Sequence, residues 1–353
     1  MRKLATIRTI ASVSPIPDAD KIEKVRVDGW DAVVKKGVFK EGDPCVYFEI
    51  DSFLPMEERY EFLRKSSYKK IQATGQEGFR LKTITMRGQI SQGLVMPLTD
   101  FPALLSLPHG ADVTEALKVE KYDPPVPACL SGEVWGYMAG TVPMTDQERI
   151  QNIFRNLKDD TEAYGMKYEA TIKLDGTSMT MYVDPDKDRF CVCGRTLSLK
   201  ENPNVSYWQA ARELPYEDIL RNGGTFKAAN RIFDTRKLAL QGEVVGPGIQ
   251  ENNEKLKKTG FFLFDIYDME ERRYLSPEER TEFTALFKIP HVPVVGHYTG
   301  SQLFSGSVDD ILLMAVGPSM NPLSEREGLV FKRSDGRRSF KAISNKYLKD
   351  QKD

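Results

Sequence analysis

The sequence predicts an α+β protein with two domains: an N-terminal small β-barrel, then a larger domain of antiparallel sheets and helices. Three observations support this fold class. The 353 residues suffice for two domains with separate hydrophobic cores. Residues 1–100 contain short apolar and polar alternations separated by turn residues. From residue 145 onward, helical periodicity and strand alternation are mixed, after a stretch rich in Pro and Gly.

The first domain is assigned to residues 1–120. Its strand-like segments read "KIEKVRVDG", "WDAVVKKG", "DPCVYFEIDSFLP", "LKTITMRG" and "QGLVMPL". Strands at this spacing indicate a small barrel or sandwich, and the size fits the five-stranded oligonucleotide-binding (OB) type. Such barrels serve many functions; from its likeness to the OB type, this domain is expected to bind nucleic acid.

A linker is predicted at residues 121–144, which are rich in Pro and Gly. The second domain, residues 145–353, is expected to begin with a helix. Thr145 and Glu148 have the spacing of a capping box, in which side chains bond the first free amides. Apolar residues then recur at helical spacing (Ile150, Phe154 and Leu157).

The rest of the second domain is predicted to be mixed. Strands are expected at "KYEATIK", "SMTMYV", "CVCGRTLSL", "LALQGEVVG", "GFFLFDIYD", "EGLVFKR" and "RSFKAIS". Residues 203–235 are expected to be mostly helical, with a break near "NGG". Another helix is predicted to start after Ser276, since Pro277 would occupy its first position and Glu279 would complete a capping box.

The overall charge is balanced, with 50 Lys and Arg against 51 Asp and Glu. No global field therefore attracts nucleic acid or membrane, and a basic surface must be local. Residues 325–349 contain such a local excess: eight basic residues against three acidic ones (Arg326, Lys332, Arg333, Arg337, Arg338, Lys341, Lys346 and Lys349; Glu325, Glu327 and Asp335).

Cysteine and histidine usage argues against a zinc site, because the four Cys lack paired spacing and the chain has three His. Cys191 and Cys193 alternate in a predicted strand, so both should face one side of a sheet in a reducing compartment. No apolar run approaches about 20 residues, and the N-terminus lacks a signal-peptide core. A soluble, cytoplasmic protein is expected.

The segment "TIKLDGTSMT", residues 171–180, places Lys173 at the end of an apolar alternation, directly before Leu174, Asp175 and Gly176. A lysine is a covalent nucleophile only when its amine is neutral, which requires lowering a pKa near 10.4. Gly176 would let a phosphate approach the backbone. The Lys-x-Asp-Gly pattern arises by chance in roughly one such chain in ten, so a hairpin with a solvated lysine is the alternative.

Later segments add residues of the same chemistry. Glu243 lies in an apolar run, where a carboxylate is costly to bury unless it is paired or binds a cation. Phe264 offers an aromatic face on a predicted strand. Glu327 and Lys332 are at odd spacing on one strand, so we expect only one of them to face a given cleft.

In this order, the segments resemble the nucleotidyltransferase domain of ATP-dependent polynucleotide ligases and messenger-RNA capping enzymes. The resemblance spans about 180 residues and rests on Lys173 to Gly176, Arg195 in "CGRTLSL", Glu243, Phe264, "EGLVFK" and "SFKAIS". With the barrel before it and "TDQERIQN" upstream of Lys173, the chain is similar to RNA ligases of the Naegleria type. DNA ligases and capping enzymes carry the barrel after the transferase domain, so domain order favours RNA.

The resemblance implies an ATP-grasp-like arrangement of antiparallel sheets with helices, and ATP and Mg²⁺ or Mn²⁺ as cofactors. Lys173 would attack the α-phosphorus of ATP and carry AMP, which passes to an RNA 5′-phosphate before a 3′-hydroxyl displaces it. The implied partner is nicked or broken RNA with 5′-phosphate and 3′-hydroxyl ends, bound by a monomer.

The resemblance also assigns roles to residues. The catalytic set is Lys173, Asp175, Glu243, Glu327 and Lys341. Asp175, Glu243 and Glu327 would surround the metal, directly or through water. The nucleotide would contact Thr171, Ile172, Lys173, Gly176, Arg195, Glu243, Phe264, Lys332, Lys341 and Lys346, with Phe264 stacking on adenine. Nucleic acid would contact Arg149, Gln151, Asn152 and Arg338.

The last motif departs from the family pattern. Ligases often have Lys-x-Lys, but Ile343 follows Lys341 at the second position; Lys346 or Arg338 would have to supply the second cation. A DNA ligase remains an alternative, because no motif exposes recognition of the 2′-hydroxyl. A capping guanylyltransferase is disfavoured by domain order. A non-catalytic nucleic-acid-binding module is the alternative from another class.

Overall fold

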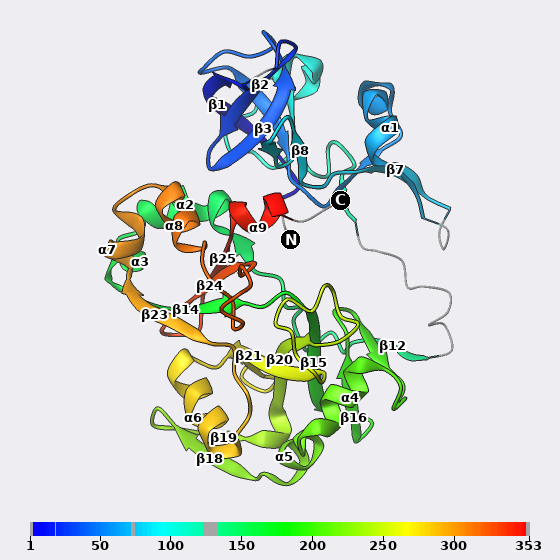
Figure 1. Ribbon diagram of the computed structural model, residues 1–353, viewed down its shortest axis with the longest axis vertical. Coiled ribbons are helices and arrows are strands. Elements are labelled where there is room, and N and C mark those ends of the chain that lie inside the picture. The colour runs from blue at the N-terminus through cyan, green and yellow to red at the C-terminus, as the bar shows by residue number, and fades with distance from the viewer. Residues whose placement is uncertain (1–2, 18, 72–74, 123–132, 351–353) are drawn as a thin grey trace. The chain divides into compact units, whose positions relative to one another are not determined.

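The computed structural model describes residues 3–17, 19–71, 75–122 and 133–350, and the chain divides into two compact units near residue 128 (Figure 1). The bounds of the two domains at residues 1–120 and 145–353 stay a prediction. Residues 123–132 of the predicted linker lie outside the described residues. Further along that segment, strand β12 (Val134–Tyr137) belongs to a sheet of the second unit.

The first unit is built on a five-stranded antiparallel sheet in the order β10-β4-β1-β2-β3. These strands are β1 (Ala5–Pro15), β2 (Ile22–Val27), β3 (Trp30–Lys35), β4 (Pro44–Phe48) and β10 (Leu94–Pro97). A second sheet contains β5 (Ser52–Pro55), β6 (Tyr68–Lys70), β7 (Glu77–Arg80) and β11 (Glu120–Lys121), and β8 (Ile84–Met86) pairs with β9 (Gln89–Ser91). Short helices η1 (Glu58–Leu63), α1 (Arg64–Ser67), η2 (Leu98–Asp100) and η3 (Pro102–Leu104) connect them.

Strand β1 is the central strand of the five-stranded sheet, where it pairs with both β2 and β4. Its register shifts between Ile10 and Ser12, as at a β-bulge, which lets one long strand serve a curled sheet. Buried side chains on its two sides feed two apolar clusters, one containing Ile7 and Phe48 and the other containing Ile10 and Trp30. Two packed cores inside a small curled sheet agree with the predicted OB-like barrel.

The described part of the second unit contains two large sheets and a two-stranded hairpin. The seven-stranded antiparallel sheet has the order β12-β17-β16-β15-β20-β21-β22, with β15 (Thr177–Asp184), β16 (Arg189–Cys193), β17 (Leu197–Leu199), β20 (Leu238–Val245), β21 (Gly260–Asp268) and β22 (Arg273–Tyr274). The five-stranded sheet has the order β13-β25-β24-β14-β23, with β13 (Glu148–Arg149), β14 (Lys167–Lys173), β23 (Val294–Thr299), β24 (Gly328–Arg333) and β25 (Ser339–Ile343). Only the β13–β25 pairing is parallel in this sheet.

Helices cover the outer faces of both sheets (Figure 1). They are α2 (Ile150–Lys158), α3 (Thr161–Gly165), α7 (Gly300–Phe304) and α8 (Val308–Met314) on the five-stranded sheet, and α4 (Ser206–Glu213), α5 (Tyr216–Asn222) and α6 (Pro277–Phe287) on the seven-stranded sheet. Between the sheets lies a smaller apolar cluster that includes Ile172, Leu174, Val245 and Phe264. Sites with convergent polar groups form readily beside such a cluster, where two sheets meet.

Most predicted elements of this unit are confirmed, including helix α6. The Ser276 side chain accepts from the Glu279 amide at 3.1 Å, and Glu279 accepts from the Ser276 amide at 2.7 Å, which is the predicted capping box. Cys191 and Cys193 are both buried in one apolar cluster, as expected for one face of a strand. The antiparallel sheets with covering helices confirm the predicted fold class.

Two local predictions were wrong. Helix α2 starts at Ile150 without a side-chain cap, because Glu148 and Arg149 pair with β25 and Thr145 instead contacts Ser178 through their hydroxyl oxygens at 2.7 Å. Residues 203–235 are helical only as far as Asn222. The rest forms a hairpin of β18 (Thr225–Ala228) and β19 (Arg231–Asp234), followed by the short helix η5 (Thr235–Lys237).

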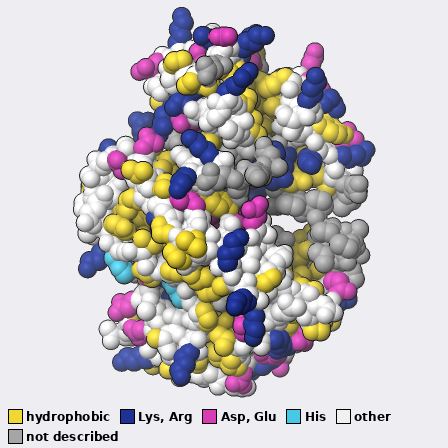
Figure 2. Space-filling model, viewed as in Figure 1, with side chains coloured by type: hydrophobic (Ala, Val, Ile, Leu, Met, Phe, Trp, Pro, Cys, Tyr) yellow, Lys and Arg dark blue, Asp and Glu magenta, His cyan; other side chains and the backbone are white. Residues whose placement is uncertain are grey.

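Figure 2 shows Lys and Arg side chains interspersed with Asp and Glu on the face that it presents, in keeping with the balanced composition. No helix within the described parts of the chain is long and apolar enough to cross a membrane. Residues 325–349, the predicted local basic surface, also expose fewer basic side chains than their composition suggested. Arg326 is buried and donates to the carbonyls of Met314, Ala315 and Val316, and Lys332 and Arg333 are buried as well.

Candidate active site

Strand β14 brings Lys173 to the junction of the two sheets. It runs between β23 and β24, so both its edges are hydrogen-bonded and its position is fixed. Tyr168 and Ala170 point into the helix-covered core, and Thr171 and Lys173 point to the other side. Lys173 is the last residue of the strand, and its Nζ donates to Glu327 Oε2 at 2.6 Å.

The turn after Lys173 brings the chain against β20. A Cβ on Gly176 would collide with the Val244 carbonyl oxygen and would lie 2.9 Å from Glu243 Cγ. Glycine is therefore required where the turn passes close to β20, and this close contact places Glu243 beside Lys173. Asp175 sits in the same turn, where its carboxylate accepts from Asn253 Nδ2 at 2.8 Å and bonds the Tyr347 side chain. Tyr347 belongs to α9 (Asn345–Asp350).

A cavity of about 210 Å³ opens beside Lys173. Eight of the ten residues predicted to bind nucleotide line it: Thr171, Ile172, Lys173, Arg195, Glu243, Phe264, Lys332 and Lys341. Strands of both large sheets contribute to this lining, which explains why Thr171 and Lys341, 170 positions apart in the sequence, meet here. Gly176 shapes the turn behind this lining. Lys346 lies elsewhere, exposed on α9, with its Nζ 2.9 Å from Glu325 Oε2.

The carboxylates around Lys173 keep its amine charged in this state of the protein. Burial lowers the pKa of Lys173, but Glu327, Glu243 and Asp175 together raise it above the ordinary 10.5. Burial also raises the pKa of Glu243 to about 8, and it raises the pKa of Asp175. Three carboxyl groups thus share one region where full ionisation is costly, so a further cation in this region would be favoured.

Two other lysines line the same cavity. Burial lowers the pKa of Lys332 to about 8 although Asp265 opposes the effect, and burial together with Lys173 lowers the pKa of Lys341 to about 8. The Lys332 ammonium donates to Asp265 Oδ1 at 2.7 Å and to the Phe264 carbonyl. Cationic side chains that repel one another in a cavity favour an anionic ligand.

Behind this cavity lies a buried network centred on Arg280 of α6. Arg280 pairs with Glu169 of β14 and lies 3.8 Å from Asp265 of β21, and its Nε donates to His291 Nε2 at 2.8 Å. Burial and Arg280 lower the pKa of His291 to about 3, so this ring is neutral. The network joins the two sheets and fixes Asp265, which in turn holds Lys332.

Glu327 and Lys332 were expected to differ, with only one of them facing a given cleft. Glu327 precedes β24, which begins at Gly328, so the alternation of that strand does not govern it. Lys332 lines the cavity directly, and Glu327 reaches Lys173 from the adjacent turn. Of the two residues, only Lys332 lines the nucleotide cavity, as expected, although Glu327 lies just before the strand and not on it.

The three predicted metal-binding carboxylates fit the vicinity of Lys173, but they do not form a compact ligand set. In the described ranges, no three or more His, Cys, Asp or Glu side chains are arranged to hold one ion directly. Their mutual effects on pKa show that Asp175, Glu243 and Glu327 nevertheless act on one another. Mg²⁺ retains several water ligands in most sites, so this donor set suits a hydrated cation.

The predicted nucleic-acid residues fall at the rim and behind it. Arg149 lies beside Lys341 in the β13–β25 pair and is close enough to lower the pKa of that lysine. Asn152 Nδ2 donates to Glu148 Oε1 at 2.6 Å, whereas Gln151 is only 4 % exposed. Arg338 lines a small cavity that shares Thr145, Asp146, Gln147 and Lys332 with the nucleotide cavity.

The structure adds residues that sequence patterns did not single out. Arg195 Nη2 donates to Asp146 Oδ1 at 2.9 Å and to Asp146 Oδ2 at 2.6 Å, so Asp146 positions that arginine at the cavity. Its signal was its place in "TDQERIQN", the segment before the nucleophile strand. Asn253 and Tyr347 hold Asp175 but carry no sequence signal, since both are polar residues in a loop and a terminal helix.

Comparison with known families agrees with both units. A model of an OB-fold domain matches residues 4–98, and the RNA ligase family model matches residues 166–343. No curated protein sequence matches the chain.

Solved structures of Naegleria gruberi RNA ligase are similar along nearly the whole length. A mutant solved with AMP and Mn is 45% identical, with 99% of each chain covered and a TM-score of 0.82. Another mutant, solved with ATP and Mn, is 44% identical over 99% of each chain, also with a TM-score of 0.82. The enzyme solved with PPi is 45% identical over 99% of this chain and 98% of that chain, with a TM-score of 0.80. Given this match and the lysine-centred cavity between its sheets, the chain belongs to the RNA ligase family, with an OB-fold domain ahead of the ligase domain.

Proposed function

We propose that this RNA ligase uses ATP to seal RNA ends, most simply nicks in duplex RNA, through a lysyl-AMP intermediate on Lys173. The observation that carries the proposal is one cavity lined by the Lys173 amine, by Lys332 and Lys341 and by the Phe264 ring. These groups suit the nucleophile, the phosphate oxygens and the adenine of ATP, respectively. The Naegleria gruberi enzymes solved with AMP or ATP and Mn support this choice of nucleotide.

In the first step, Lys173 Nζ attacks the α-phosphorus of ATP. The new P–N bond forms as the P–O bond to pyrophosphate breaks, so the attacking nitrogen and the leaving oxygen must lie in line. Before the attack, the ammonium must lose a proton, and Glu327 Oε2, 2.6 Å from Nζ, is the base within reach. Lys332 and Lys341 would offset charge on the phosphate oxygens.

In the second step, an oxygen of an RNA 5′-phosphate attacks the AMP phosphorus, and the Lys173 nitrogen leaves and regains a proton. In the third, the 3′-hydroxyl attacks the 5′-phosphorus and AMP departs. A divalent cation, when bound, supplies charge neutralisation at phosphate and favours the neutral amine. Asp175, Glu243 and Glu327 would hold it through its water ligands. The ring of Phe264 would fix adenine throughout.

The substrate half of the proposal is tested with matched nicked duplexes. We expect faster sealing when the strand ending in the 3′-hydroxyl is RNA than when it is DNA, with the same 5′-phosphate strand in both. Equal rates would favour the DNA-ligase alternative. Labelling of the protein by GTP in place of ATP would point to capping, and no labelling by either nucleotide would leave a binding module.

The pH dependence of lysyl-AMP formation should show that Lys173 starts as an ammonium. Because its pKa is raised, the neutral fraction at neutral pH is small and grows about tenfold per pH unit until pH reaches that pKa. The single-turnover rate should therefore rise steeply from pH 6.5 to 9. Glu327→Gln removes the strongest raising influence, so its profile should shift to lower pH. A flat profile in the parent protein would contradict this assignment.

A monomer in a reducing compartment such as the cytoplasm completes the proposal. Cys45, Cys191 and Cys193 are buried and are not in disulfides, which is compatible with such a compartment. Size-exclusion chromatography with light scattering would test the monomer.

A further inference from the structure

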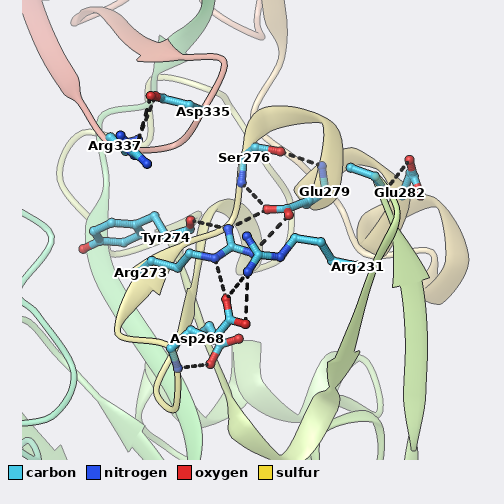
Figure 3. A network of polar contacts seen from close by, with 11 residues as sticks. Arg231, Asp268, Arg273, Tyr274, Ser276, Glu279, Glu282, Asp335 and Arg337 are labelled. Atoms are coloured by element: carbon cyan, nitrogen blue, oxygen red, sulfur yellow. Dashed lines mark hydrogen bonds and ion pairs between the residues drawn. The ribbon is translucent and has the colours of Figure 1, made fainter.

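A second, larger cavity lies on the same unit, beyond the nucleotide cavity. It has a volume of about 620 Å³, and four arginines line it: Arg231, Arg272, Arg273 and Arg337. Figure 3 shows Arg231 and Arg273 meeting carboxylates on one side, with Arg337 across from them. None of these arginines belongs to the nucleotide cavity described above.

The acidic residues of this region are already matched by arginines. Glu271 pairs with Arg231 at 2.8 Å, and Glu279 pairs with Arg273 at 2.8 Å. Asp335 pairs at 2.7 Å with Arg333, a buried residue outside the lining. Hydrogen bonding from Arg273 lowers the pKa of Glu271, so that carboxylate is ionised. Its negative charge is balanced by the arginines that it contacts.

Two arginines of the lining are not matched by a carboxylate of their own. Arg272 is exposed and has no hydrogen-bond or ion-pair partner among the described residues. Arg337 has a side chain that is 80% exposed, and its Nε lies 3.9 Å from Asp335, whose oxygens bind Arg333. The cavity therefore carries about two surplus positive charges, in the residue type suited to bidentate contact with phosphate.

The arginine cavity neighbours the active site, because a small cavity between them shares lining residues with both. The small cavity lined by Arg338 shares Lys332 and Asp146 with the nucleotide cavity, and it shares Tyr274 and Gly336 with the arginine cavity. The elements are shared as well. Phe264 and Arg273 lie on the paired strands β21 and β22, while the β24–β25 loop between Lys332 and Lys341 carries Arg337.

We propose that this arginine cavity binds the phosphodiester backbone of the RNA next to the ends being joined. The inference rests on the proposed function, because it extends that substrate from its reacting end along its backbone. Arg272 and Arg337 make the phosphate contacts, and Arg338 lies between them and the reacting phosphate. Arg231 and Arg273, which are bound to carboxylates, shape the wall.

The test is equilibrium binding of a fluorescent nicked RNA duplex to the full chain at several salt concentrations. For R272Q/R337Q we expect Kd to rise about ten- to hundredfold and the slope of log K against log salt to fall by about 1.5 to 2. The control R212Q/R236Q removes the same charge from surface arginines that line none of the three cavities described above, and its Kd should stay within about twofold of the parent value.

Labelling by ATP separates the sources of phosphate. In R272Q/R337Q, the KM for ATP in lysyl-AMP formation should be unchanged. A raised KM for ATP with unchanged RNA binding would mean that the arginines hold the triphosphate, and it would overturn the proposal. Equal RNA binding by the test and control variants would also overturn it. If the parent protein forms no lysyl-AMP, the proposed function fails, but the RNA-binding comparison still decides this inference.

Discussion

Lys173→Arg is expected to abolish lysyl-AMP formation, with a loss of about 10⁴-fold or more. Arginine can keep a cation beside Glu327, so the ion pair and the local packing are retained. It cannot supply a neutral nitrogen, because the guanidinium is not deprotonated in proteins. Incubation with labelled ATP and Mg²⁺ or Mn²⁺, followed by gel electrophoresis and intact mass measurement, gives the readout.

The matched control uses RNA whose 5′ end is already adenylylated. Joining this RNA requires only the third step, in which no P–N bond forms, so Lys173→Arg should still carry it out at a measurable rate. Joining therefore shows that the variant is folded and binds RNA. A persistent adenylate mass on the variant would place the nucleophile at another residue and remove the mechanism proposed above.

Arg280→Met should lower the free energy of unfolding of the ligase unit by about 3–5 kcal/mol. The side chains of Arg280 and Glu169 are 1% and 4% exposed, so removing the arginine leaves the Glu169 carboxylate without its partner in a poorly solvated region, whereas Asp265 keeps Lys332. His291 would also lose the donor to its Nε2. Urea unfolding provides the measurement, followed by the fluorescence of a W30F background, which removes the tryptophan of the first unit and keeps Trp208 in the ligase unit.

A surface pair serves as the control. Arg221 makes two ion pairs, with Asp188 and Glu217, but at the surface such pairs contribute little, so Arg221→Met should cost about 1 kcal/mol or less. Combining Arg280→Met with Glu169→Gln should recover part of the loss, since one uncompensated charge is then absent. If Arg280→Met alone costs no more than Arg221→Met, the network does not join the sheets as described.

The strands that contain the site residues could be predicted because the apolar pattern of each strand is visible within its own short segment. β14, β20, β21 and β24 are apolar enough to read as strands, and Lys173, Glu243 and Phe264 stand out against that background. Their convergence could be expected from the family order of motifs. The pairing of β14 with β24, which sets Lys173 opposite Gly328, depends on contacts about 155 residues apart and required the structure.

Other features could not be read locally. The hairpin β18–β19 turns at Ala229 and Asn230, both with positive φ (44° and 65°), and without a glycine there the usual hairpin signal was missing. The start of α2 moved because Glu148 and Arg149 pair with β25, which is a tertiary effect. The basic composition of residues 325–349 hid the fact that Arg326 is buried against carbonyl groups.

The close approach at Gly176 limits how this enzyme can change over evolution. Because a side chain there would strike β20, the nucleophile and Glu243 are coupled mechanically: a substitution that shifts one also displaces the other. Adaptation to new substrates is then easier at positions outside this rigid unit, such as the arginines of the β22 and β24–β25 loops. Reactivity and selectivity for RNA can in that way diverge separately within a single domain.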